Sequence, residues 1–367
     1  IRADLADERG YVALLSFSNT AVNTFKGEFR DKQQGLKGKF QDRVVIETLD
    51  SFITTNILRP HAYRVMECST TPFLLTGNEN FLNNDKCKFW VESPIRNFTV
   101  PINLIGSISI EIEEGDYRFY YQGNGKRSPI NNGVKAIDAI AKVGGYTHEF
   151  GKLWASQTLT QQPGVLRSLS KRYPHIIVDE AQDLDCLHWL ILKTLSDAGS
   201  TITLIGDPNQ AIYEFAGANG DVIKQFDADD NNYCLPLTKN YRSIEDILTI
   251  ANKLSERNDD HEKGKVHQQH GVYYIPYDPK KLPDLAASFT KHLEAINLKN
   301  SESAILFRGN AGIENLKSSK GKVGVGKSKI FAMAAIKRDV NQDYHKSFQL
   351  CLGAIVGLLA SPPDDLA

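Results

Sequence analysis

Two short apolar runs, each ending in acidic or amide residues, constrain the fold of this chain more than any other feature. The runs are His175–Val178 and Thr201–Ile205, and an amphipathic segment of roughly 20 residues separates them. β-Branched runs in this arrangement predict a βαβ unit with buried parallel strands. The carboxyl ends of parallel strands meet at one edge of a sheet, where ligands bind. We therefore expect the polar residues that follow the two strands to converge there: Asp179, Glu180, Asp207 and Gln210.

The adjacent carboxylates Asp179 and Glu180 suit nucleotide hydrolysis. Asp179 would hold Mg²⁺, directly or through water, while Glu180 would orient the attacking water. The alternative is structural: both acids cap the following helix, whose positive N-terminus favours negative charge by about 0.3–1 kcal/mol. Two further polar segments favour the catalytic interpretation, namely Gly206–Gln210 after the second strand and Thr238–Ser243 beyond it.

Several segments, in the same order along the chain, resemble motifs of the UvrD/Rep-type superfamily 1 helicases. Val178–Asp183, Gly206–Tyr213 and Leu237–Ser243 are similar to motifs II, III and IV of that family. Leu14–Ala21 resembles motif Ia, and Thr48–Phe52 resembles the short DNA-binding motif that follows it. Because these signatures occur together and in the family's order, the resemblance is specific.

The resemblance implies an α/β fold of the P-loop NTPase type, with RecA-like parallel sheets in two lobes and an inserted subdomain. The expected division is 1–55 and 151–235 for the first lobe, 56–150 for the inserted subdomain, 236–320 for the start of the second lobe, and 321–367 for a helical segment that begins an insertion in that lobe. Within the inserted subdomain the pattern predicts a hairpin of Ile102–Glu113 and Asp116–Tyr121 around Glu114 and Gly115. This β content departs from the mostly helical insertion of the well-known members.

The resemblance also implies ATP and Mg²⁺ as ligands. Gln210 then senses the γ-phosphate, together with Arg242 as an arginine finger, whose fork of donors suits the charge on a transferring phosphoryl group. By the same resemblance, Tyr241 stacks on the adenine and Asp207 belongs to the nucleotide-binding set. For Arg242 the structural alternative is a salt bridge at the start of a helix.

Contacts with nucleic acid are expected at the remaining motif residues. Hydroxyl groups at strand ends suit hydrogen bonds to the phosphate backbone, so Thr48 and Ser51 are expected to contact phosphate. By resemblance, Phe17 and Asn19 lie beside single-stranded DNA. Aromatic residues of motif III are expected to stack on bases, at about 1–3 kcal/mol per base: Tyr213 and Phe215. The structural alternatives are an ordinary helix cap by Ser18 or Asn19 and core packing of the aromatic rings.

Gly321–Ser328 matches the GxxxxGK[ST] pattern of a phosphate-binding P-loop. A functional P-loop directly follows a buried strand, whereas residues 311–320 are polar and helical in character. We therefore interpret Gly321–Ser328 as a flexible turn that leads into a helix from Ile330. In the family the P-loop precedes the strand that begins at Tyr11, so we expect this chain to start just downstream of it. No segment resembles the family's final motifs V and VI.

Composition bears on how the chain could bind DNA and on the cellular compartment in which it works. A formal net charge of -1 gives no overall basic bias, so DNA binding requires a local groove. The 5 cysteines are scattered and never form a Cys-x-x-Cys pair, which argues against a disulfide framework or zinc site and favours the cytoplasm. The longest apolar run, Leu350–Ala360, is too short to span a bilayer, and we expect no membrane contact.

The function that these observations favour is an ATP-dependent DNA helicase or translocase that acts on single-stranded DNA or on a junction with duplex DNA. Movement from 3′ to 5′ is implied by the family alone. Two alternatives stay open: an ATP-sensing subunit of a nuclease or anti-phage complex of the Gabija type, and a DNA-binding module without turnover. A nuclease or DNA-repair protein is the expected class of partner. The partial chain by itself is expected to be inactive.

Overall fold

The chain forms two units, which are described here one at a time. The computed structural model describes residues 10–33, 43–93, 97–123, 126–211, 220–229, 232–263, 274–278, 281–307, 309, 312–313, 316, 330–331, 333–335, 338 and 344–356. The first unit comprises residues 1–238 with 255–258, and the second comprises residues 239–254 with 259–367.

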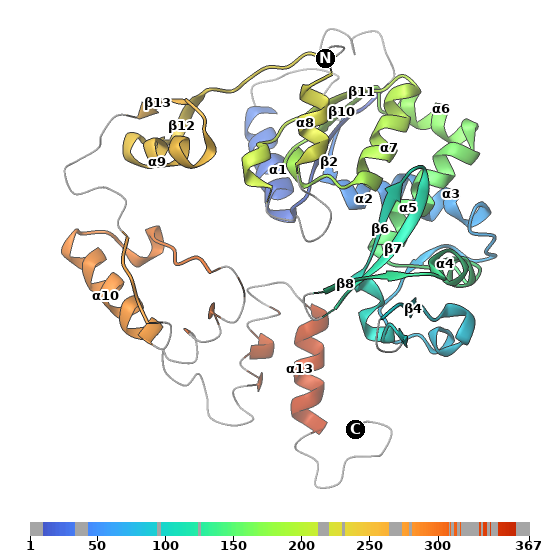
Figure 1. Ribbon diagram of the computed structural model, residues 1–367. Helices are drawn as coiled ribbons and strands as arrows, with labels where there is room; N and C mark the ends of the chain where they lie inside the picture. Colours follow the sequence, from blue (N-terminus) through green and yellow to red (C-terminus); the bar gives the residue numbers. More distant parts are fainter. Residues whose placement is uncertain are drawn as a thin grey trace. The chain divides into compact units, whose positions relative to one another are not determined.

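A four-stranded parallel sheet forms the centre of the first unit (Figure 1). Its order is β11 (Thr201–Leu204), β10 (His175–Val178), β1 (Val12–Ser16) and β2 (Val44–Thr48). All neighbouring pairs run parallel, with Leu15 opposite Val178 and Val178 opposite Leu204. The α/β fold with parallel strands that the two apolar runs predict is therefore confirmed.

Helices precede or follow these strands along the chain, and several of them bury apolar side chains in the core. They are α1 (Asn19–Gln33), α2 (Leu49–Ile53), which continues through a π-helix (Thr54–Leu58) into α3 (Arg59–His61), α5 (His148–Gln161), α6 (Pro163–Arg172), α7 (Cys186–Asp197) and α8 (Asp221–Asp227). Local signals set the starts of several helices. Thr147 and Asp185 cap α5 and α7 by accepting a backbone N–H, and α6 begins with Pro163, where no donor is needed.

The part of the chain between β2 and β10, called here the inserted segment, contains a five-stranded antiparallel sheet in the order β5 (Phe98–Thr99), β4 (Trp90–Val91), β8 (Lys126–Ile130), β7 (Asp116–Gly123) and β6 (Ile108–Glu113). The predicted hairpin is confirmed, because β6 and β7 pair around Glu114 and Gly115. Both turn residues have positive φ, 52° and 89°, as a type I′ turn requires. The strand predicted from Ile102 starts later, because Leu104 N donates to Pro101 O and residues Ile102–Ser107 form a 3₁₀ turn.

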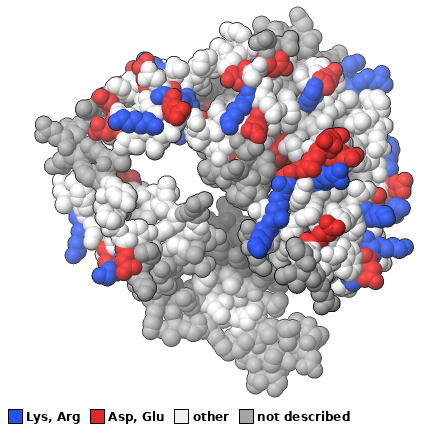
Figure 2. Space-filling model, in the orientation of Figure 1, with Lys and Arg blue, Asp and Glu red and all other residues white. Residues whose placement is uncertain are grey.

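Smaller elements complete the inserted segment. They are the two-stranded parallel ladder of β3 (Phe73–Leu74) with β9 (Gly145–Tyr146), the helix α4 (Gly133–Ala141), and short 3₁₀ turns at Ala62–Arg64, Asn80–Asn83 and Asp85–Cys87. Over β6, β7 and β8, basic and acidic side chains lie close together on the face drawn in Figure 2. Arg127, for example, pairs with Glu111 at 2.5 Å and stacks on Tyr120. The guanidinium of Arg127 therefore has both an acidic and an aromatic partner within the sheet.

The second unit contains the parallel pair β12 (Lys239–Ile244) and β13 (Asp260–Lys263), with the helices α9 (Glu245–Ser255), α10 (Leu282–Ala295) and α13 (Tyr344–Val356). From its sequence, this unit is expected to have a polar surface loop at 257–265 and a strand at 303–308, and both expectations are wrong for the described residues. The polar segment 257–265 contains β13, because its backbone pairs with β12 although its side chains are charged. Residues 303–307 form no strand: Leu306 is 89% exposed, and no described strand pairs with it. The sequence pattern also predicts a strand at 271–275 and a helix at 310–319. These two segments, like Gly321–Ser328, lie wholly or partly outside the described residues.

Within the described parts of the chain, no helix combines the length and apolar character needed to cross a bilayer. All five cysteines carry free thiols.

Candidate nucleotide-binding edge and nucleic-acid pocket

The carboxyl ends of the central strands carry the first group of predicted site residues. Directly after β10, Asp179 N donates to Leu15 O on β1 at 2.8 Å. Two residues later Ala181 N donates to Ile205 O, which follows β11, at 2.9 Å. The backbone of Asp179 and Glu180 is thereby fixed between the ends of two neighbouring strands, with Asp179 half-buried and Glu180 exposed.

Glu180 has a left-handed backbone, with φ 56° and ψ 41°. Such a conformation costs a residue other than glycine about 1–3 kcal/mol and is concentrated at functional sites. The Glu180 side chain accepts no hydrogen bond from the backbone of the 3₁₀ turn that follows it. The next helix, α7, is capped instead by Asp185, which accepts a hydrogen bond from His188 N at 2.9 Å. The structural interpretation of Glu180 as a helix cap is therefore wrong.

Gln182 joins the two segments that the sequence predicts to meet. Its Nε2 donates to Glu180 Oε2 at 2.7 Å, and its Oε1 accepts from Asp207 N at 3.1 Å. The side chain is 3% exposed, and a Cβ added to Gly206 would lie 2.5 Å from its Oε1. Gln182 was not among the predicted site residues, although an amide between two acids, able to donate on one side and accept on the other, was a signal for it.

The chain of contacts continues to the predicted phosphate sensor. Gln210 Nε2 donates to Asp207 Oδ2 at 3.0 Å, and Asn209 N donates to Asp207 Oδ1 at 3.0 Å. Arg257 forms an ion pair with the same carboxylate at 3.0 Å. Burial raises the pKa of Asp207, but these hydrogen bonds and the nearby guanidinium outweigh burial and leave the pKa lowered. Asp207 is therefore a charged anchor that holds the exposed Gln210 side chain.

The acids at this edge fit a divalent cation. Burial and the charge of Glu180 raise the pKa of both Asp179 and Asp183. The carboxylates at this edge therefore repel one another, and a bound cation would relieve this repulsion. Asp183 Oδ1 is buried and accepts no hydrogen bond from any described residue. No group of three or more metal-binding side chains occurs among the residues the structure describes. A single carboxylate such as that of Asp179 is a ligand through which proteins bind Mg²⁺ with nucleotides, together with phosphate oxygens and water.

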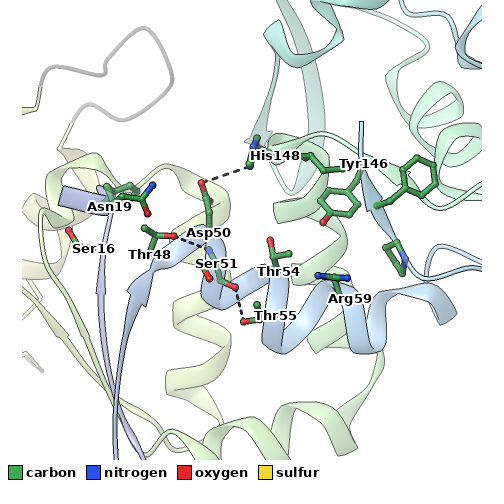
Figure 3. A pocket seen from close by; sticks show the side chains of 14 residues that line it. Ser16, Asn19, Thr48, Asp50, Ser51, Thr54, Thr55, Arg59, Tyr146 and His148 are labelled. Atoms are coloured by element: carbon green, nitrogen blue, oxygen red, sulfur yellow. Dashed lines mark hydrogen bonds and ion pairs between the residues drawn. The ribbon is translucent and has the colours of Figure 1, made fainter. Parts of the chain in front are cut away.

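A pocket of about 630 Å³ carries the second group of predicted residues (Figure 3). It opens where β1 and β2 end, and the inserted segment forms its other wall. The predicted nucleic-acid contacts that line it are Phe17, Asn19, Thr48 and Ser51. The other lining residues were not predicted, among them Arg59, Tyr146 and His148. Tyr146 and His148 are distant in sequence from the motifs, so no local pattern identified them.

Several residues near the pocket take part in helix capping, and some of them also line the pocket surface. Ser18 caps α1 by accepting from Ala21 N at 3.0 Å, which leaves Asn19 exposed as the first residue of the helix. Thr48 Oγ1 accepts from Ser51 N at 3.2 Å, and Ser51 Oγ donates to a neighbouring glutamate. Both hydroxyl groups remain at the pocket surface. Phe52, the last residue of the Thr48–Phe52 motif, is completely buried in the core.

The other predicted residues lie elsewhere. Tyr213 and Phe215 are outside the described residues. Tyr241 and Arg242 lie on β12 of the second unit and are exposed, with Asn240 Oδ1 accepting from Arg242 N at 2.9 Å. Their roles at a nucleotide therefore stay predictions.

Comparisons with known proteins find similarity to one family of DNA helicases. Residues 132–231 match the model of the UvrD/REP helicase N-terminal domain. The chain is 26% identical to the ATP-dependent DNA helicase PcrA of Leuconostoc citreum, over 56% of this chain and 27% of that protein. It is 28% identical to DNA helicase II of Haemophilus influenzae, over 41% of this chain and 22% of that protein. The chain thus spans about a quarter of the length of these relatives.

Proposed function

Because this chain is related to the UvrD/Rep-type DNA helicases, we propose that the protein containing it couples ATP hydrolysis to movement along single-stranded DNA. The observation that carries this proposal is the link from Glu180 through Gln182 to Asp207 and Gln210 at the ends of β10 and β11. Such a link between an exposed acid and an exposed amide suits a site where hydrolysis of a phosphate must be sensed. Movement in the 3′ to 5′ direction is part of the proposal.

In the proposed reaction, the chain contributes positioning and charge. Asp179 would hold Mg²⁺, which neutralises charge on the phosphate oxygens when it is bound. Glu180 would accept a hydrogen bond from the attacking water and orient it toward the γ-phosphate. Gln210 would donate to the γ-phosphate and change partner when that phosphate leaves, with Asp207 as the alternative partner. The roles proposed for Arg242 and Tyr241 are contacts with the γ-phosphate and the adenine, respectively.

In the same proposal, single-stranded DNA occupies the pocket at the ends of β1 and β2. Thr48, Ser51 and Asn19 would hydrogen-bond phosphate and sugar oxygens, and Arg59 would add a positive charge. Phe17 would stack on a base. The buried hydroxyl of Ser16, which also lines this pocket, makes no hydrogen bond to any described residue and so supports a polar ligand there. The aromatic residues of motif III, Tyr213 and Phe215, would stack on further bases.

The test is unwinding of a duplex with a 3′ single-stranded tail by the purified full-length protein. The wild type should unwind this substrate with ATP, and Glu180→Gln should abolish unwinding. Asp197→Asn, which alters an exposed carboxylate at the end of α7, is the control and should unwind normally. DNA binding without ATP hydrolysis would instead indicate a passive DNA-binding module. Nucleotide-dependent control of a nuclease, without unwinding, would indicate a regulatory subunit.

A further inference from the structure

A buried chain of alternating charges runs from α5 to the wall of the DNA pocket. Lys152 on α5 lies between Glu149, at 2.5 Å, and Asp185, which precedes α7. Asp185 Oδ2 lies 3.1 Å from His188 Nδ1, and His188 Nε2 lies 3.3 Å from Asp50 Oδ1. Lys152, Asp185 and His188 are all buried. Asp50 ends the chain of charges at the pocket, where its side chain is 54% exposed.

His188 faces a carboxylate from each of its two ring nitrogens. A carboxylate oxygen lies within ion-pair distance of each nitrogen, and these two negative charges favour the imidazolium form, although only Nε2 makes a hydrogen bond to a described residue. Burial by itself lowers the pKa of His188, but the charge of Asp185 outweighs burial and leaves the pKa raised. The hydrogen bond from His188, in turn, lowers the pKa of Asp50. The pair is therefore an ion pair that reaches from the interior to the pocket surface.

Asp50 is an unfavourable residue for a pocket that takes DNA. Among the described residues that line the pocket, it supplies the one carboxylate, and a carboxylate repels the phosphate backbone. Figure 3 shows Asp50 directed toward His148, whose Nδ1 lies 4.0 Å from Asp50 Oδ2, but His148 is largely exposed. The buried neighbour that offsets the charge of Asp50 is His188, whose ring also packs edge-on against Phe17, with centroids 5.5 Å apart.

We propose that His188 is a positioning residue of the DNA pocket: as an imidazolium it neutralises Asp50 and supports Phe17, so that a single-stranded phosphate backbone can enter beside them. The imidazole is held for this purpose by Asp185, which lies two residues beyond the Asp179–Asp183 segment. The inference rests on the proposed DNA-binding function. It adds that the electrostatics of the pocket are set from the interior, by a residue that DNA does not touch.

The experiment is equilibrium binding of a fluorescein-labelled single-stranded oligothymidylate to the full-length protein, followed by fluorescence anisotropy. His188→Gln leaves Asp50 uncompensated and should weaken binding about tenfold at moderate salt. Asp50→Asn should bind at least as tightly as the wild type. The double variant should recover most of the affinity, which a purely structural role of His188 would not allow. His175→Gln changes a half-buried histidine at the opposite end of the sheet and should bind normally.

Each outcome decides between the inference and the proposed function. Binding by His188→Gln within about threefold of the wild type, or a double variant as weak as His188→Gln, would overturn the inference alone. Wild-type protein that does not bind the oligothymidylate would reject the proposed function itself. If His188→Gln does not fold, as judged by its melting curve, Asp50→Asn decides: affinity equal to or above the wild type supports the inference, and a clear loss overturns it.

Discussion

Gln182→Ala tests whether the contacts at the strand ends serve catalysis. The substitution removes the hydrogen bond to Glu180 Oε2, at 2.7 Å, and the hydrogen bond from Asp207 N, at 3.1 Å. Glu180 then loses the group that holds its carboxylate, while the left-handed backbone that presents it remains. The segment that carries Gln210 loses its link to the acids in the same step.

The expected magnitude follows from the two contacts. A hydrogen bond to a charged group contributes about 1.5–3 kcal/mol, and one between neutral groups about 1 kcal/mol. If the bond to Glu180 is needed in the transition state, its loss lowers kcat by about 10- to 100-fold, since each 1.4 kcal/mol is about a tenfold change in rate. The free energy of unfolding should fall by about 1–3 kcal/mol, because Asp207 N is left without its partner.

The assay is ATP hydrolysis by the full-length protein, stimulated by single-stranded DNA, with urea unfolding measured in parallel. The control is Gln162→Ala, because Gln162 also uses both amide atoms, with Arg64 and the backbone of His61, away from the predicted sites. Gln162→Ala should lose stability but keep its kcat. Equal kcat values for Gln182→Ala and the wild type would refute the reasoning.

Two other predictions concern stability. Gly206→Ala places a Cβ 2.5 Å from Gln182 Oε1, so the melting temperature should fall and the ATPase rate should fall with it; an unchanged melting temperature would contradict the close approach. Burial raises the pKa of Asp185, but the charges of His188 and Lys152 outweigh burial and lower the pKa far below its unfolded value of about 3.9. This stabilisation is present above the unfolded pKa and is lost as the pH falls toward the folded one. The free energy of unfolding should therefore fall below about pH 4, and less steeply in Asp185→Asn; equal slopes in urea titrations would contradict the assignment.

Local patterns predicted the central sheet and the hairpin well. The β-branched runs at β10 and β11 and the Glu114-Gly115 turn each carry their own conformational preference, so their sequence determines their structure. Backbone pairing between distant segments was harder to predict. Strand β13 is charged and lacks apolar alternation, and it forms because its backbone meets β12. Residues 303–307 are apolar enough for a strand but find no partner among the described residues.

In the candidate site, too, some residues could be predicted from local sequence and others could not. Asp179, Glu180, Asp207 and Gln210 lie at predicted strand ends, and parallel topology alone brings them to one edge. The chain of charges from Lys152 to Asp50 could not be predicted, because its members lie on segments far apart in the sequence and each resembles an ordinary surface residue by itself. Burial of charge becomes visible only once the helices are packed.

The most direct measurement of the central claim separates ATP binding from ATP hydrolysis in Glu180→Gln. Glutamine keeps the size of the side chain but lacks the negative charge with which Glu180 would hold the attacking water. With a fluorescent ATP analogue and single-turnover hydrolysis by the full-length protein, the variant should bind nucleotide as the wild type does, while hydrolysis slows by about 100-fold or more. Hydrolysis at the wild-type rate would contradict the account, because the acid at the end of β10 would then not align the attacking water.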